Sequence, residues 1–334
     1  MHKINRRHTI RLAAASALAA GFPALARGQT QNPAQNWPQR FVRLVVPFTS
    51  GGGIDTIGRI VGARLSEIWG QQVVVENKPG AGGNIASEFV ARSDPDGLTM
   101  YITAGGLAVN KFLFEKISYD PIADFAPVTL ICLYPNLMVV PNSSPFRSAG
   151  ELIAFAKANP GKLTFGTPGH GSSPHMAGEL FKYLAGIDLT HVPYRGAAAA
   201  LTDLIAGRTD MSFAVMASGL PLAQQGQIRA LAVTTASRAA MAPDIPTIAE
   251  SGVNGYDMSS WFAFVVPAKT PAAIVQKIQA DTAAVLKEPA IKERLDKLGV
   301  VIVGSTQAEL AAHLKAEMER WEPVIKRANI KVQE

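Results

Sequence analysis

Short runs of hydrophobic residues alternate with helix-like patterns along almost the whole chain from Phe41 onward. Several runs are consecutive Val, Ile and Leu, which is typical of strands covered by helices on both faces of a sheet. The pattern therefore predicts an α/β fold. The predicted strands are 41–47, 72–76, 98–103, 127–133, 136–141, 163–166, 190–193, 211–215, 228–234, 261–266 and 300–303.

Two of the predicted helices have clear start signals, and a third has a clear amphipathic pattern. The helix at 148–158 begins at Ser148, a good N-cap residue, and the helix at 174–184 has proline at its first position. The helix at 306–328 is long and amphipathic, because its apolar residues recur at helical spacing.

Two extended segments, 130–141 and 261–267, carry prolines at their ends and contain no helix between strand runs. Two such crossings predict an inserted domain. The first domain would comprise 37–137 and 264–334, and the second 138–263. In such architectures ligands bind between the domains, at the carboxyl ends of the strands.

The amino terminus predicts export. Residues 12–25 form an apolar run that is preceded only by basic charges and ends in Ala-Leu-Ala at 24–26. This pattern is typical of a cleaved signal peptide at 1–26, and the run is too short to span a bilayer as a helix. The pair Arg6-Arg7 leaves Sec and twin-arginine export both open. We therefore expect a periplasmic protein.

Charge and cysteine content exclude several classes of partner and framework. Removing 1–26 takes away four of the 32 basic residues and none of the 26 acidic ones, so the formal net charge falls from +6 to +2. A nearly neutral surface gives no reason to expect nucleic acid or an anionic membrane as partner. The single cysteine, Cys132, excludes a disulfide framework and is predicted to be a buried thiol.

The segment PFTSGGGID, residues 47–55, joins an apolar strand to a helix-like pattern. Glycines allow backbone N–H groups to approach a guest closely, and a helix N-terminus attracts anions. No Lys follows the glycines and GxGxxG spacing is absent, so a nucleotide phosphate is not the expected guest. An ordinary strand-to-helix turn is the alternative.

Three further loops share this chemistry. Residues 77–84, 103–106 and 165–173 are rich in glycine and hydroxyl or amide side chains, and each follows a predicted strand. Hydroxyls and helix N-terminal amides can hold a carboxylate without a buried arginine. Turns are also built from these residues, but four such loops together favour a binding cleft.

Seven motifs, in order along the chain, resemble those of the Bug-type, TctC-like solute receptors of tripartite tricarboxylate transporters. They are VPFTSGGGID (46–55), VVVENKPGAGGNIAS (73–87), DPDG (94–97), YDPIADFAPV (119–128), FGTPGHGSSPHMAGELF (165–181), HVPYRGAAAALTDLIAGRTDM (191–211) and P-T-x-x-E-S-G (246–252). The resemblance implies a two-domain type II periplasmic-binding-protein fold. It also implies a monomeric receptor without cofactor that closes on a small carboxylate-bearing molecule and delivers it to membrane transporter components.

The resemblance also implies which residues hold the ligand. In similar proteins two loops hold one carboxylate through backbone amides, hydroxyls and ordered water. The matching residues are Phe48, Ser50, Gly53, Ile54, Asp55, Thr167, Gly169, Ser172 and Ser173. The chain departs from the family at Thr49-Ser50, and it has fewer hydroxyls at 103–106, where Thr103 would serve the far end of the pocket. A less polar or bulkier ligand tail, for example an aromatic one, is the hypothesis that follows. The expected ligand is therefore a dicarboxylate, a tricarboxylate or an aromatic acid.

Several of these positions have a purely structural interpretation as well. Asp55 precedes Arg59 by four residues, so a salt bridge on the first helix would explain both. His175 could donate to a ligand or to a neighbouring carbonyl. Tyr194 and Arg195 end a strand, and Arg195 is the cation we expect near the far end of the ligand.

Three more residues, Asp210, Trp261 and Phe262, also have two possible roles. Asp210 begins a strand and could face the cleft or cap a loop amide. Trp261 and Phe262 lie at the second crossing, where packing is the favoured role and a wall of the ligand site the alternative.

An enzyme or a metal site is not favoured. Ser172, Ser173 and the nearby histidines lack the G-x-S-x-G elbow of a serine hydrolase. His170 and His175, with His191 further on, do not have a spacing that places two ligands on one helical face. We therefore predict a non-enzymatic receptor. A periplasmic sensor is the first alternative, and a secreted serine hydrolase is a less favoured one.

Overall fold

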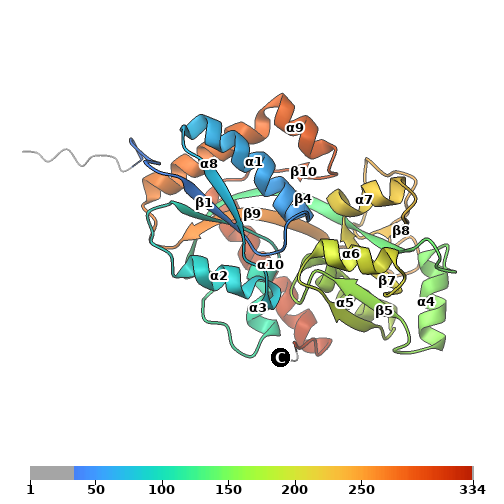
Figure 1. The fold of residues 1–334 in the computed structure, drawn as a ribbon. Helices are drawn as coiled ribbons and strands as arrows, with labels where there is room; N and C mark the ends of the chain where they lie inside the picture. Colours follow the sequence, from blue (N-terminus) through green and yellow to red (C-terminus); the bar gives the residue numbers. More distant parts are fainter. Residues whose placement is uncertain (1–33, 333–334) are drawn as a thin grey trace, which may run out of the picture.

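The computed structural model describes residues 34–332, so the predicted signal peptide lies outside the described residues. The chain folds into an α/β structure with one curled ten-stranded sheet, which confirms the predicted fold class. The strands are β1 (Val42–Val46), β2 (Val73–Asn77), β3 (Thr99–Thr103), β4 (Phe125–Pro141), β5 (Thr164–Thr167), β6 (Thr190–Pro193), β7 (Met211–Val215), β8 (Ile228–Val233), β9 (Ser259–Pro267) and β10 (Val301–Ile302). The helices form two lobes around this sheet (Figure 1).

The first lobe contains strands in the order β2-β1-β3-β9-β4, with β10 paired to β4. β1 pairs in parallel with β2 and β3, while β9 runs antiparallel to β3 and β4. On one face lie α1 (Gly53–Trp69), α8 (Ala272–Lys287) and α9 (Pro289–Asp296), and on the other lie α2 (Asn84–Ala91), α3 (Gly106–Leu113) and α10 (Gln307–Arg327). Helices on both faces explain why the strands read as continuous apolar runs.

The second lobe is built on β5, β6, β7 and β8. Its helices are α4 (Ala149–Ala158), α5 (Ser173–Ala185), α6 (Ala197–Ile205) and α7 (Met216–Gln224). α5 packs with the main core through Met176 and Phe181, while α6 and α7 share a smaller cluster that includes Leu204 and Met216. β5 is parallel to both β6 and β7, so their carboxyl ends meet at one edge of the sheet.

Two long strands, β4 and β9, connect the lobes. β4 pairs with β9 up to Pro135 and with β7 and β8 from Asn136 onward. The sequence predicted two strands here, 127–133 and 136–141, but the structure has one. Pro135 lies where the strand changes partners, and the missing N–H of a proline is tolerated at such a place. The predicted domain boundaries, 137/138 and 263/264, fall within these two strands and remain a prediction.

The predicted helix starts are confirmed. The side chains of Ser148 and Ser172 accept hydrogen bonds from the backbone N–H three residues later, and Thr306 forms a capping box with Glu309. Cys132 is fully buried, and burial raises the pKa of its thiol. It is therefore a packing residue within the strand β4.

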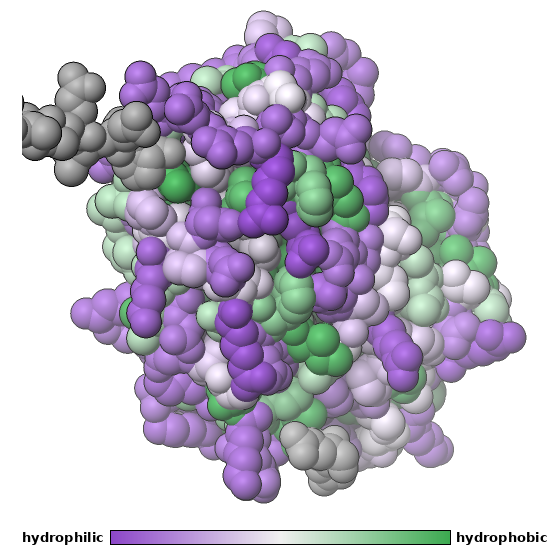
Figure 2. Space-filling view, turned by 60° about the vertical axis from the view of Figure 1, so that its left-hand side comes forward, coloured by the Kyte–Doolittle hydropathy of each residue, from purple (hydrophilic) through white to green (hydrophobic). Residues whose placement is uncertain are grey.

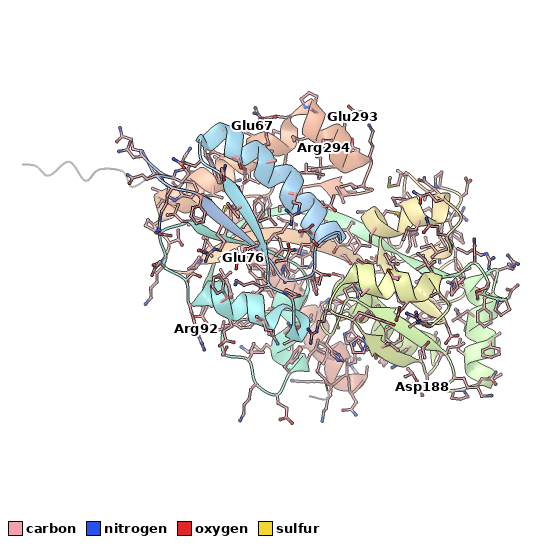
Figure 3. All side chains as sticks on the ribbon, viewed as in Figure 1. Glu67, Glu76, Arg92, Asp188, Glu293 and Arg294 are labelled. Carbon is pink, nitrogen blue, oxygen red and sulfur yellow. The ribbon has the colours of Figure 1, made fainter. Side chains whose placement is uncertain are left out.

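The face of the molecule drawn in Figure 2 is mostly polar. Polar and charged side chains there surround small, separate apolar patches (Figure 2). Charged residues such as Glu67, Arg92 and Asp188 lie at the periphery of the lobes (Figure 3). Between residues 34 and 332, no helix combines the length and apolar character needed to cross a bilayer.

Candidate functional site

A small pocket lies between the two lobes, at the ends of several strands. Its lining residues come from both lobes and from both crossing strands: Phe48, Gly52, Gly53, Ile54, Ala104, Tyr134, Pro168, Ser172, Ser173, Pro174, Ala197, Val215 and Phe262. Five of the predicted ligand-binding residues are therefore brought together: Phe48, Gly53, Ile54, Ser172 and Ser173. The pocket volume is about 30 Å³, which is room for about one or two water molecules.

Five helices begin at this pocket. Residues at or next to the first turns of α1, α3, α5, α6 and α7 line it: Gly52 to Ile54, Ala104, Ser172 to Pro174, Ala197 and Val215. Among these helices only α5 has a side-chain cap, from Ser172. The first N–H groups of a helix have no partner within it, and they carry partial positive charge. The pocket is thus suited to an anion although no cationic side chain lines it.

The remaining wall of the pocket is apolar and aromatic. Tyr134 of β4 and Phe262 of β9 lie with their ring centroids 4.4 Å apart, and Val215 faces them from the start of α7. Phe262 therefore lines the pocket, whereas Trp261 packs against α10 and donates to Glu317 at 3.0 Å. Sequence reasoning missed Tyr134 and Val215. Their only signal was their place at a domain crossing and at the end of a predicted strand.

The phenol of Tyr134 is a neutral donor in this wall. Burial raises its pKa, and hydrogen bonding to the Ser173 and Ser260 side chains only partly offsets that effect. The hydroxyl therefore keeps its proton at physiological pH. It is one of the few polar side-chain groups next to the pocket.

Asp55 is held within the protein. Its carboxylate accepts from the Gly51 N–H at 3.0 Å, from two Arg59 nitrogens at 3.0 Å each, and from Asn77 Nδ2 at 2.9 Å. Asn77 also donates to the Phe48 carbonyl at 2.9 Å. The salt bridge predicted as the structural alternative is thus present, and Asp55 supports the 47–55 loop from behind rather than lining the pocket.

These contacts set the charge state of Asp55. Burial alone would raise its pKa, but hydrogen bonds from Arg59, Gly51 and Asn77 outweigh burial, so the pKa lies below its ordinary value. A depressed carboxyl pKa stabilises the folded state above the unfolded pKa, about 3.9, and this contribution is lost as the pH falls through the folded value.

We expect Asp55→Asn to lower the free energy of unfolding at pH 7 by about 1–3 kcal/mol, because it weakens a buried, charged hydrogen-bond network. The difference from the wild type should shrink below about pH 4. Urea unfolding at several pH values measures both effects, with Asp188→Asn at an exposed position as control. Unchanged stability together with lost ligand binding would instead assign Asp55 a direct ligand contact.

Other predicted residues lie behind or beside the pocket. Ser50 is exposed, while Thr103 and Thr167 are buried outside the lining. Thr167 Oγ1 lies 2.6 Å from His191 Nε2 and accepts from the Gly169 N–H at 3.2 Å. Gly169 has φ of +131°, a conformation that L side chains rarely adopt, so glycine is needed to shape this loop.

The residues predicted for the far end of the ligand are not in the pocket lining. The Tyr194 hydroxyl donates to Asp203 at 2.9 Å, and Arg195 is exposed. Asp210 accepts from the N–H and Oγ1 of Thr164, at 2.7 and 2.8 Å, at the amino end of β5. For Asp210, capping accounts for these contacts.

The serine and histidine side chains do not form a hydrolase pair. Ser172 Oγ donates to the Gly169 carbonyl at 2.6 Å and meets His175 only through the backbone N–H, at 3.3 Å. A serine nucleophile needs a hydrogen bond to the ring of its base. Ser172 is thus a helix cap that belongs to the pocket wall.

The two lobes touch around the pocket. A Cβ on Gly53 would lie 2.9 Å from Val215 Cγ1, and one on Gly196 would lie 1.9 Å from Thr49 Oγ1. At a second contact between the lobes, a Cβ on Gly82 would lie 2.2 Å from the His170 carbonyl oxygen. Glycine therefore permits close approach of the lobes, and the structure represents a closed arrangement.

A family model matches most of the chain. The model described as the tripartite tricarboxylate transporter family receptor matches residues 57–330.

Solved structures extend this similarity to the fold. The chain is 41% identical to R. palustris Rpa4515 with adipate, with a TM-score of 0.86, covering 89% of this chain and 100% of that one. It is 30% identical to the periplasmic binding protein BugD (TM-score 0.85, covering 89% and 100%). It is 31% identical to MatC from Rhodopseudomonas palustris with bound malate (TM-score 0.83, covering 86% and 100%).

Proposed function

Because the chain belongs to the tripartite tricarboxylate transporter receptor family, whose relatives include periplasmic binding proteins, we propose that it captures a small carboxylate between its lobes. We further propose that it acts as a monomer in the periplasm and delivers this ligand to the membrane components of a tripartite transporter. The two-domain fold and the receptor class are those of its relatives. The ligand, its contacts and the delivery step are the proposal.

The convergence of five helix N-termini on one pocket carries this proposal. A carboxylate offers two oxygen acceptors, which match unpaired N–H groups and hydroxyls and gain from the positive ends of the helix dipoles. In our assignment one carboxylate accepts from backbone N–H groups at Gly53 and Ile54 in one lobe and from Ser172 and Ser173 in the other. Such a ligand stabilises the closed state because it contacts both lobes.

The apolar wall favours a ligand whose middle is hydrocarbon. Phe48, Tyr134, Val215 and Phe262 can enclose methylene groups, whereas they offer one hydroxyl for polar substituents. Relatives are described with adipate and with malate. We place this chain's ligand in the class of short aliphatic dicarboxylates.

Ligand entry requires the lobes to separate. A volume of about 30 Å³ does not accommodate a dicarboxylate, so the ligand enters an open state, and the side chains that line the pocket rearrange around it as the lobes close. Hinge closure of this kind bends the connecting segments. Here these are β4 and β9.

A thermal-shift panel of adipate, malate and aromatic acids, each beside its neutral amide, tests this function. At about 100 times its dissociation constant, a bound ligand should stabilise the fold by about 2.7 kcal/mol. We expect aliphatic dicarboxylates to raise the melting temperature and the amides to have no effect. A panel in which no acid raises the melting temperature, or in which the amides match the acids, contradicts the proposal.

A further inference from the structure

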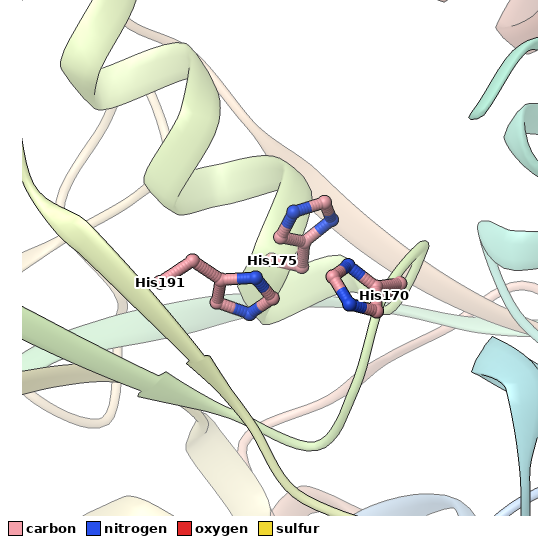
Figure 4. A group of neighbouring side chains, drawn as sticks. All are labelled: His170, His175 and His191. Atoms are coloured by element: carbon pink, nitrogen blue, oxygen red, sulfur yellow. The ribbon is translucent and has the colours of Figure 1, made fainter. Parts of the chain in front are cut away.

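Three histidine side chains gather at the base of the 167–173 loop. His170 lies in the loop, His175 in the first turn of α5 and His191 on β6, and their rings face one another (Figure 4). The ring centroids are 4.3 to 5.4 Å apart, and one nitrogen from each residue lies within 4.8 Å of the other two. None of the three lines the pocket between the lobes, so they form a separate cluster.

The spacing of His170 and His175 did not predict this cluster, because the spacing rule assumes that both ligands lie on one helix. His170 precedes α5 and lies in a loop that contains Gly169 and Gly171, both with positive φ. The loop therefore turns His170 back over the first turn of α5. His191 joins them because β6 pairs with β5, whose last residue, Thr167, leads into the loop.

The three rings differ in how their nitrogens are engaged, and among the described residues Nδ1 of His170 is a buried nitrogen without a hydrogen bond. Nδ1 of His175 accepts the Gly171 N–H at 3.1 Å, so its proton belongs on Nε2, which lies 3.9 Å from the Glu179 carboxylate. Nε2 of His191 is paired with Thr167 Oγ1 at 2.6 Å. Nδ1 of His170 is buried and has no hydrogen-bond partner among the described residues.

The rings are also in the charge state that metal binding requires. Burial lowers the pKa of all three, and for His175 and His191 the neighbouring histidines lower it further. The pKa of His191 falls to about 3. Neutral imidazole is the form that ligates metals.

We propose that His170, His175 and His191 bind a divalent transition-metal ion, of the class of Zn²⁺ or Cu²⁺, through Nδ1 of each ring. Imidazole nitrogen suits both ions, and three protein ligands leave a coordination position for water. The Glu179 carboxylate lies 3.9 Å from Nε2 of His175, so a small movement would let it accept from that nitrogen, as a carboxylate does that orients a ligating histidine.

Metal binding would change the loop in a defined way. Bonds of about 2.0–2.1 Å in a tetrahedral site place ligand nitrogens about 3.3 Å apart, so the three rings must draw together from their present separation. Nδ1 of His175 must also give up the Gly171 N–H. The metal thus acts on the loop that continues into Ser172 and Ser173 of the pocket.

Isothermal titration of the untagged, chelator-treated protein with ZnCl₂ alone, and separately with CuCl₂, tests the site. We expect one equivalent to bind, and His170→Asn to weaken it by at least about tenfold. Because His170 is half-buried, the His170→Asn variant should fold. The control is His313→Asn, which removes a histidine outside the cluster and should bind the metal as the wild type does. Electron paramagnetic resonance of the Cu²⁺ form should show coupling to three imidazole nitrogens.

Two results would overturn the inference. One is the absence of stoichiometric binding of either ion by the wild type. The other is binding that His170→Asn leaves unchanged or whose spectrum lacks three nitrogen ligands, since the metal would then lie elsewhere on the chain.

Discussion

Gly53→Val is expected to reduce dicarboxylate affinity by about 10- to 100-fold, because about 1–3 kcal/mol is the usual cost of forcing extra methyl groups into packed space. Gly53 is the first residue of α1, and its Cβ would approach Val215 of the other lobe to 2.9 Å. The added side chain therefore blocks both the approach of the lobes and the access of the ligand to the first N–H groups of α1. Isothermal titration with the acid identified in the thermal-shift panel measures the loss.

The stability of the ligand-free protein should change little in this variant. Gly53 has no positive φ, so valine meets no backbone strain there, and the open lobes relieve the clash. Gly150→Val is the matched control, because Gly150 lies in the first turn of α4 and is exposed, and a Cβ there would meet only Ser148 Oγ, at an unstrained 3.9 Å. Wild-type affinity in Gly53→Val, or equal losses in both variants, would contradict the role assigned to Gly53.

Gly196→Val should produce a loss of similar size from the opposite lobe. Gly196 caps α6, and its Cβ would lie 1.9 Å from Thr49 Oγ1 and 3.1 Å from Thr49 Cβ. Its φ of 170° is ordinary extended backbone, so the substitution is not strained by conformation. Gly196 is outside the pocket lining, which means that a loss of affinity would report closure rather than a lost ligand contact.

The two substitutions together test whether closure is one equilibrium. If each prevents the same closed state, the double variant should lose less affinity than the sum of the two single losses, as expected for coupled sites. Ala198→Val, on the exposed side of the first turn of α6, is the control. Fully additive losses, or a normal affinity in Gly196→Val, would show that the lobes need not meet at Thr49 for binding.

The sequence predicted the elements of the fold closely because alternating apolar strands and capped helices carry local signals. Ser148 and Thr306 each identified a helix start that the structure confirms. The exception is β4, which was predicted as two strands, 127–133 and 136–141, that are separated at Tyr134 and Pro135. A proline ends a strand only where its missing N–H is needed, and the exchange of partners between β9 and β7 depends on tertiary structure.

The candidate site could be predicted only in part. Gly53, Ile54, Ser172 and Ser173 belong to glycine- and serine-rich segments that are recognisable in the sequence. Tyr134 and Val215 carry no such local signal, because their place in the pocket follows from how two lobes meet. The helix starts at Ala197 and Met216 likewise lack side-chain caps, and a missing cap leaves no residue type to recognise.

The contacts of charged residues and histidines are the least predictable from the sequence. Arg195 lies two residues after the end of β6 and is exposed, and Asp55 is held by Arg59 and Asn77. Long side chains at strand ends can take either direction, so their sequence position does not determine their contacts. His170 and His191 come together only because the loop after β5 reverses direction.

A crystal structure of the chain with its best-bound dicarboxylate would test the central claim most directly. We expect one carboxylate to lie between the lobes and to accept hydrogen bonds from N–H groups at Gly53 or Ile54 and from Ser172 or Ser173. The lobes should be closed, and Tyr134 and Phe262 should enclose the hydrocarbon part. A carboxylate bound outside this pocket, or held by Arg195 without contacts to the two helix N-termini, would contradict the account.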